Sequence, residues 1–205
     1  MVFAFGGFLE TILKNLADIQ TGYSFRGRLE YSDCGNVRVI QMKDLNSDNI
    51  VDCRELIKID MKDVKEHHLV KKGDLVFRSR GINCTASILL EELENTVVSA
   101  PLLKIRVADS LQVFPEYLKW FINQPDSQKF LQSRLSGTHG GMIRASELAE
   151  LPVSVPDLKT QKLIVEISEL AEKEHRILSE IAELKKDYIS KLLINSAKGY
   201  ISLAI

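Results

Sequence analysis

The segment SGTHGG at positions 136–141 is the first candidate for chemistry, because glycines surround a threonine and a histidine there. A catalytic or zinc-binding histidine needs a second histidine, cysteine or carboxylate at a matching spacing, and none can be recognised for His139. The glycines do not precede a Lys-Ser or Lys-Thr pair, so they do not form a nucleotide-binding P-loop. No step of bond making or breaking can be assigned, so a loop residue, with or without a phosphate contact, is favoured over a catalytic histidine.

Positive charge gathers in three short segments, 22–30, 71–83 and 134–144, although the whole chain carries a net charge of −1. Arginine in glycine- and serine-rich loops suits bidentate contact with a phosphate or with the edge of a guanine. Such segments are also typical of solvated loops on any protein surface, so both interpretations stay open. The candidate nucleic-acid contacts are Tyr23, Arg26, Arg28, Arg78, Arg80, Asn83, Arg134, His139 and Arg144, with Phe25 as a lesser candidate.

The composition is that of an ordinary globular protein, with 205 residues, 45% of them hydrophobic and 27% charged. This length suits one large domain, or a domain of about 150 residues with an appendage. Cys34, Cys53 and Cys84 are far apart and odd in number, which favours reduced thiols, no zinc site and no cofactor. No apolar stretch approaches the ~18 residues of a membrane span, and the apolar start lacks the basic residues of a signal peptide. We therefore expect a cytoplasmic protein without a membrane partner.

The first half of the sequence is rich in strand patterns. Residues 8–19 are the exception, because their apolar side chains recur at helical spacing and predict an amphipathic helix. Pro101 indicates an edge or a bulge in the strand that contains it. Short strands with turn signals between them predict a compact barrel or sandwich over residues 20–107. The clearest strand candidates are 37–41, 85–90 and 96–107.

The second half is helical in pattern. Residues 114–137 have helical spacing, and Pro125 is expected to divide them into two helices. Residues 157–195 contain neither glycine nor proline, and they repeat apolar residues in the heptad pattern of a coiled coil. A helix of about 39 residues would be roughly 58 Å long, so its apolar seam needs cover from a partner helix or from its own domain. The seam residues are Ile167, Leu170, Ile177, Ile181, Leu184 and Tyr188.

These patterns together predict an α+β fold in two parts. Residues 1–150 would form a β-rich domain with flanking helices. Residues 151–205 would contain one long C-terminal helix that forms a coiled coil.

Near the start of the long helix, an apolar run with two prolines leads to a glutamine. The residues are Leu151, Pro152, Val153, Val155, Pro156, Leu158, Gln161 and Ile164. In this order they resemble the conserved region of type I restriction–modification specificity (S) subunits. Upstream, LADIQTG (16–22) resembles the family's L-x-D-I-x-x-G opening, and KKGDLVFRSRG (71–81) resembles its Gly-Asp strand. Residues 117–138 resemble the helical segment that precedes the conserved region.

The resemblance implies a target-recognition domain that reads one half of a bipartite double-stranded DNA site. It also implies that the long helix is a spacer and a dock for methyltransferase subunits. The chain would not be an enzyme, because methylation and restriction belong to methyltransferase and restriction/translocase subunits. The resemblance does not transfer base-reading residues, since recognition loops vary with the DNA target.

The size departs from the family pattern. A typical member carries two recognition domains and two conserved helices, whereas this chain has one of each and looks like half a subunit. Two copies paired through antiparallel long helices would form a homodimer that reads an interrupted palindrome. Pairing with a different half would give an asymmetric target, and an inactive fragment or a recombination cassette is a third arrangement. Two other classes of function stay open: a protein-interaction adaptor with a coiled-coil helix, and an enzyme that uses His139.

Overall fold

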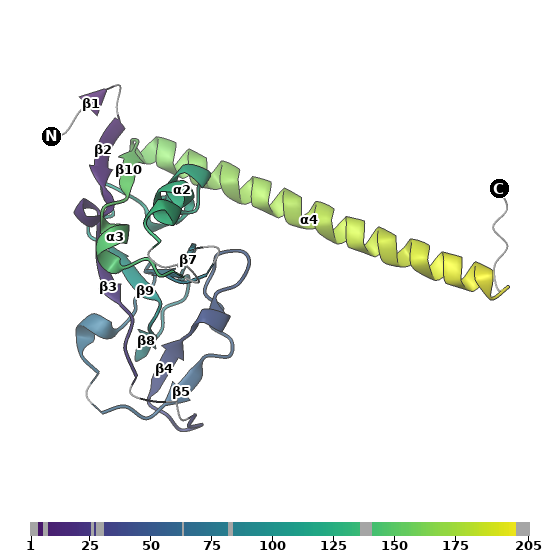
Figure 1. Ribbon diagram of the computed structural model, residues 1–205, viewed down its shortest axis with the longest axis horizontal. Coiled ribbons are helices and arrows are strands. Elements are labelled where there is room, and N and C mark those ends of the chain that lie inside the picture. The colour runs from purple at the N-terminus through teal and green to yellow at the C-terminus, as the bar shows by residue number, and fades with distance from the viewer. Residues whose placement is uncertain are drawn as a thin grey trace. The chain divides into compact units, whose positions relative to one another are not determined.

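The computed structural model describes residues 4–5, 8–25, 27, 31–62, 64–81, 84–135 and 141–199. The chain divides into two compact units, Met1–Lys162 and Leu163–Ile205. The first unit is a mixture of strands and short helices, and the second consists of most of one long helix (Figure 1). The expected α+β class is therefore confirmed. Residues 151–162, which the sequence pattern grouped with the long helix, lie in the first unit.

One small sheet joins the two ends of the first unit. Its strand order is β1 (Ala4–Phe5), β2 (Phe8–Ile12) and β10 (Pro152–Val155), all antiparallel. The helix predicted over residues 8–19 is wrong, because this stretch forms β2, a 3-10 turn η1 (Leu13–Asn15) and β3 (Ala17–Thr21). Hydrogen bonds to a distant strand override the local spacing, and the Leu13 amide also donates to the Leu151 carbonyl at 2.9 Å. The helix-like spacing arises because Leu13 and Leu16 are both buried around the turn.

Two further sheets form the β-rich body of the first unit. The larger has the antiparallel order β3, β9 (Leu103–Val107), β6 (Leu75–Phe77) and β7 (Ala86–Ile88). The smaller contains β5 (Ile57–Ile59), β4 (Val37–Ile40) and β8 (Thr96–Val98), with β4 and β8 parallel. The strands predicted at 37–41 and 85–90 are confirmed. The single strand predicted over 96–107 is wrong, because Pro101 lies in a turn that separates β8 from β9.

Short helices cover this body. Pro115 and Pro125 begin α1 (Pro115–Ile122) and α2 (Pro125–Ser133), so the predicted division at Pro125 is confirmed. The Asn123 side chain ties the end of α1 to β7, because its amide accepts from the Ala86 N–H at 2.8 Å and donates to the Ala86 carbonyl at 2.9 Å. Two 3-10 turns, η2 (Met42–Asp44) and η3 (Glu66–His68), interrupt the loops, and α3 (Ala145–Ala149) precedes β10.

The long helix α4 runs from Leu158 to Ala197 without a break. Its first turn belongs to the first unit and is held there by the fully buried side chain of Gln161. The Gln161 amide donates to the carbonyls of Gln112 at 2.9 Å and Pro156 at 2.8 Å, and its oxygen accepts from the Phe114 N–H at 3.0 Å. Within the described part of the chain, no helix is both long enough and apolar enough to span a membrane.

Candidate nucleic-acid interface

The backbone of β6 continues beyond its last strand residue and gains a new neighbour. The Arg78 N–H donates to the Thr85 carbonyl at 2.8 Å, which extends the pairing with β7. On the other side, Arg80 forms an antiparallel bridge with Met142, and the Ile143 N–H donates to the Ser79 carbonyl at 2.9 Å. Residues 78–80 are therefore held between the start of β7 and residues 142–144.

This pairing sorts the side chains onto two faces, because successive residues of an extended chain point to opposite sides. Ser79 and Ile143 lie on the inner face and are fully buried. Arg78 and Arg80 lie on the other face, and the antiparallel register puts Arg144 across from Arg78. Arg80 and Arg144 are exposed, whereas Arg78 is partly buried. We call this set of Arg78, Arg80 and Arg144 the arginine face.

The arginine face has no carboxylate partner in the part of the chain that the structure describes. Two other arginines of the first unit are neutralised: Arg54 pairs with Asp52 at 2.5 Å, and Arg106 pairs with buried Asp74 at 2.6 Å. Among the described residues, no acidic side chain forms an ion pair with any member of the arginine face. A guanidinium without a carboxylate partner keeps its N–H donors for an incoming anion or a base edge.

Arg78 is the member of the arginine face whose side chain is restrained by a hydrogen bond within the protein. Its Nη2 donates to the Leu45 carbonyl at 3.2 Å, while its buried Nε has no hydrogen-bond partner. The backbone of Arg144 is fixed, because its N–H donates to the Glu147 carboxylate at 2.7 Å at the start of α3. Its side chain is exposed and less restrained than that of Arg78. The arrangement can bind an extended polyanion, because its side chains are positive, have no ion-pair partner among the described residues, and come from two segments fixed by backbone hydrogen bonds.

The remaining predicted contacts fall in other places. Arg134 ends α2, is exposed, and holds its guanidinium carbon 5.0 Å from the centre of the Phe130 ring. The rings of Tyr23 and Phe25 lie 4.8 Å apart, centre to centre, tilted by 49°, and both side chains pack on a buried cluster of valines and an isoleucine. No described contact joins these residues to the arginine face. Arg26, Arg28, Asn83 and His139 lie outside the described residues.

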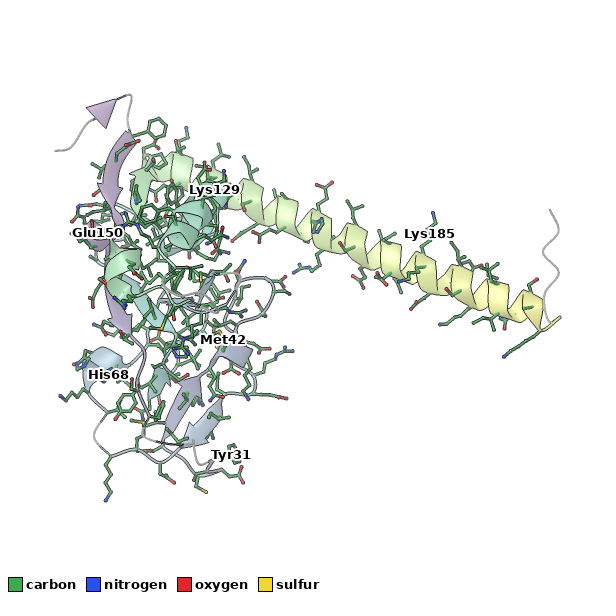
Figure 2. All side chains as sticks on the ribbon, in the orientation of Figure 1. Tyr31, Met42, His68, Lys129, Glu150 and Lys185 are labelled. Atoms are coloured by element: carbon green, nitrogen blue, oxygen red, sulfur yellow. The ribbon has the colours of Figure 1, made fainter. Side chains whose placement is uncertain are left out.

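Sequence reasoning overlooked the histidines that complete the aromatic cluster. The ring centre of His68 lies 5.1 Å from that of Tyr23 and 4.1 Å from that of His67. Burial, then the nearby His67 and Lys104, lower the pKa of His68. Figure 2 shows His68 on η3, well separated from Lys129 on α2, so the cluster and the α2 surface are different places on the first unit. The adjacent histidines gave no signal in the sequence, because the contact between the His68 and Tyr23 rings depends on the tertiary fold.

Reactive side chains are not assembled in the described part of the chain. Burial raises the pKa of the Cys53 thiol to about 11, and burial also raises the pKa of Cys84, so neither thiol is a ready nucleophile. The described residues contain no group of three histidine, cysteine or acidic side chains that could hold a metal ion.

The predicted seam of α4 is a second candidate surface, because its apolar side chains are uncovered. Their exposed fractions run from 45% for Ile177 to 67% for Leu170. Such a stripe is larger than an isolated surface helix usually presents to water. The same range includes all six seam residues named from the sequence: Ile167, Leu170, Ile177, Ile181, Leu184 and Tyr188.

Three residues of the motifs that carried the resemblance have structural roles in the first unit. A Cβ on Gly22 would come within 2.7 Å of the Ser99 backbone, so only glycine fits this approach of two chains. Gly73 has a φ of +88°, which suits the turn before β6. Asp74 is buried, accepts from the Lys71 N–H at 2.8 Å and pairs with Arg106. These residues shape the domain that presents the arginine face.

Comparison with known proteins agrees with this architecture. A solved structure described as the structural basis of complex assembly and conformational transition of the type I R-M system has a TM-score of 0.71 and 14% identity, covering 93% of this chain and 44% of that one. The HsdS subunit from Thermoanaerobacter tengcongensis gives 0.64 and 16%, covering 97% and 47%. The type I S subunit from M. genitalium gives 0.56 and 14%, covering 92% and 45%. The chain thus spans less than half the length of these solved chains.

None of the curated proteins searched matches the chain. A family model described as the type I restriction modification DNA specificity domain matches residues 10–183. This match covers both the domain that carries the arginine face and most of α4. The chain belongs to the type I restriction–modification DNA specificity domain family.

Proposed function

We propose that this chain is the DNA-sequence-recognition subunit of a type I restriction–modification complex, and that its first unit reads one half of a bipartite site. The family is non-catalytic, and catalysis lies in other subunits of the complex. The observation that carries the proposal is the arginine face, where three arginines share one side of a paired backbone and have no carboxylate partner among the described residues. Phosphates and base edges are the ligands that such donors suit.

We further propose that two copies pair through α4, antiparallel, to rebuild a whole specificity subunit. The chain spans 44% to 47% of the solved specificity chains, so two copies approach the full length. The exposed apolar seam of α4 supplies a surface that a second identical helix would bury. A homodimer of this kind would read an interrupted palindrome, because both halves present the same residues.

Selection from a library of randomised DNA duplexes tests recognition. The probe is the chain assembled with the methyltransferase subunits of its complex, and the expected product is an interrupted palindrome. Arg80→Ala combined with Arg144→Ala should weaken binding of the selected duplex and reduce its salt dependence, because each lost phosphate contact lowers the logarithmic salt slope by about 0.9. Arg54→Ala is the matched control, since Arg54 is already paired with Asp52.

A protein-interaction adaptor would give a different pattern. No duplex would be enriched, and the double arginine variant would bind its protein partner as the original chain does. Recovery of no DNA motif from the assembled complex would therefore reject the recognition proposal.

A further inference from the structure

We propose that Arg78 is the base-reading residue of the arginine face and donates to the O6 and N7 atoms of a guanine, whereas Arg80 and Arg144 contact phosphates. This inference rests on the proposed function, because it assigns roles within the same DNA-binding surface. It concerns which member of the face determines the sequence.

The first argument is the way the backbone fixes Arg78. Its own N–H is bonded to Thr85, and the next residue accepts from Ile143, so both edges of the segment are occupied. Arg78 follows Val76 on the same face of the extended chain, and Val76 is fully buried in a core cluster that includes Leu45. Arg78 therefore starts from a rigid position at the border of the core.

The second argument is the hydrogen bond from the Arg78 Nη2 to the Leu45 carbonyl at 3.2 Å. It restrains the end of a long side chain that would otherwise lose rotamer freedom on binding. The bond uses one of the two Nη2 protons, and the Nε proton is buried. The Nη1 protons and the second Nη2 proton have no acceptor among the described residues. Those two groups form the end of the planar fork that matches the two acceptors of a guanine edge.

The third argument is the contrast with the other arginines of the first unit. Arg106 is also held by the fold, but its donors are used by Asp74 and by the Leu69 carbonyl. Arg80 and Arg144 are exposed, and no side-chain hydrogen bond of theirs to a described acceptor restrains them. A mobile point of positive charge is sufficient for a phosphate, whereas base reading needs a fixed fork. Arg78 alone among these combines restraint with unpaired donors.

Lysine substitution separates the two roles, because lysine keeps the charge and loses the fork. Arg78→Lys should keep the salt slope of binding and relax the preference for one G·C pair, lowering discrimination at that position by about 10- to 100-fold. Arg80→Lys should keep both the slope and the sequence preference. Arg80→Ala should weaken binding to every duplex to the same degree and reduce the salt slope by about 0.9 for each half-site, which is about 1.8 for the proposed dimer.

The experiment is duplex selection followed by titration at several salt concentrations, with the assembled complex carrying each variant. Thermal unfolding of the same samples checks that the variants fold, since Arg78 also contacts Leu45. The inference is supported if only Arg78→Lys loses a G·C position in each half-site. It is overturned if Arg78→Lys selects the original motif, or if Arg80→Lys loses a position equally; in both cases the original complex still selects a motif, so the proposed function stands. Failure of the original complex to select any motif would instead reject the proposed function.

Discussion

The buried Gln161 offers a sharp test of how the first turn of α4 is held. Replacement by methionine keeps a similar length and volume but removes every hydrogen-bonding group. Three partners, the Phe114 N–H and the carbonyls of Gln112 and Pro156, would then lose their bonds inside the domain. Each buried polar group left unpaired costs about 1 to 3 kcal/mol, and taking the lower half of that range for the three groups gives a loss of about 3 to 6 kcal/mol for Gln161→Met.

Urea denaturation at a fixed protein concentration measures this loss, because the free energy of unfolding falls linearly with urea. Gln132→Met is the matched control: Gln132 is exposed on α2, so its free energy of unfolding should change by no more than about 0.5 kcal/mol. A loss below about 1 kcal/mol for Gln161→Met would refute the reasoning, since it would mean that the three partners find other acceptors and donors.

Three other perturbations test separate parts of the structure. Arg106→Ala leaves the buried Asp74 carboxylate unpaired and should lower the free energy of unfolding in urea by about 3 kcal/mol; an unchanged urea midpoint would contradict this. Ile177→Asp with Leu184→Asp should convert the proposed dimer into a monomer in light scattering, and aspartate at an exposed polar position of α4 should not. The pKa of His68 is lowered in the folded state, so the unfolded chain binds the proton first as pH falls from about 7.5 to about 5.5. The stability measured by thermal unfolding should therefore decrease over that window. His68→Asn should make this decrease smaller.

Local patterns predicted those elements whose hydrogen bonds or boundaries are local. The division at Pro125 follows from the fixed geometry of proline, and α4 was predictable because a long stretch without glycine or proline repeats in heptads. The stretch 8–19 was predicted wrongly because its partners are β10 and Leu151, far along the chain. Periodicity describes which side chains are buried, and here a strand, a turn and a second strand bury the same leucines that a helix would.

The arginine face illustrates the same limit at the level of the site. Sequence reasoning selected Arg78, Arg80 and Arg144 separately, from charge in small-residue loops. Their common side depends on the antiparallel pairing of residues 78–80 with 142–144, which no local rule predicts. The alternation of buried and exposed residues in both segments is consistent with that pairing, but either segment alone would fit many partners.

The positions of the motif residues bear on how one fold can recognise many DNA sequences. Gly22, Asp74 and Gln161 are buried or tightly packed, and each contacts backbone groups of its own chain. Substitutions at these positions would change the stability of the domain rather than the DNA sequence that it is proposed to recognise. Arg78 lies only one residue beyond the end of β6, and its partly buried side chain is bonded to the Leu45 carbonyl, while Nη1 has no acceptor among the described residues. Under the role proposed for Arg78, a framework that fixes the backbone at position 78 would carry a different side chain there and read a different base, without any change in the residues that carried the family resemblance.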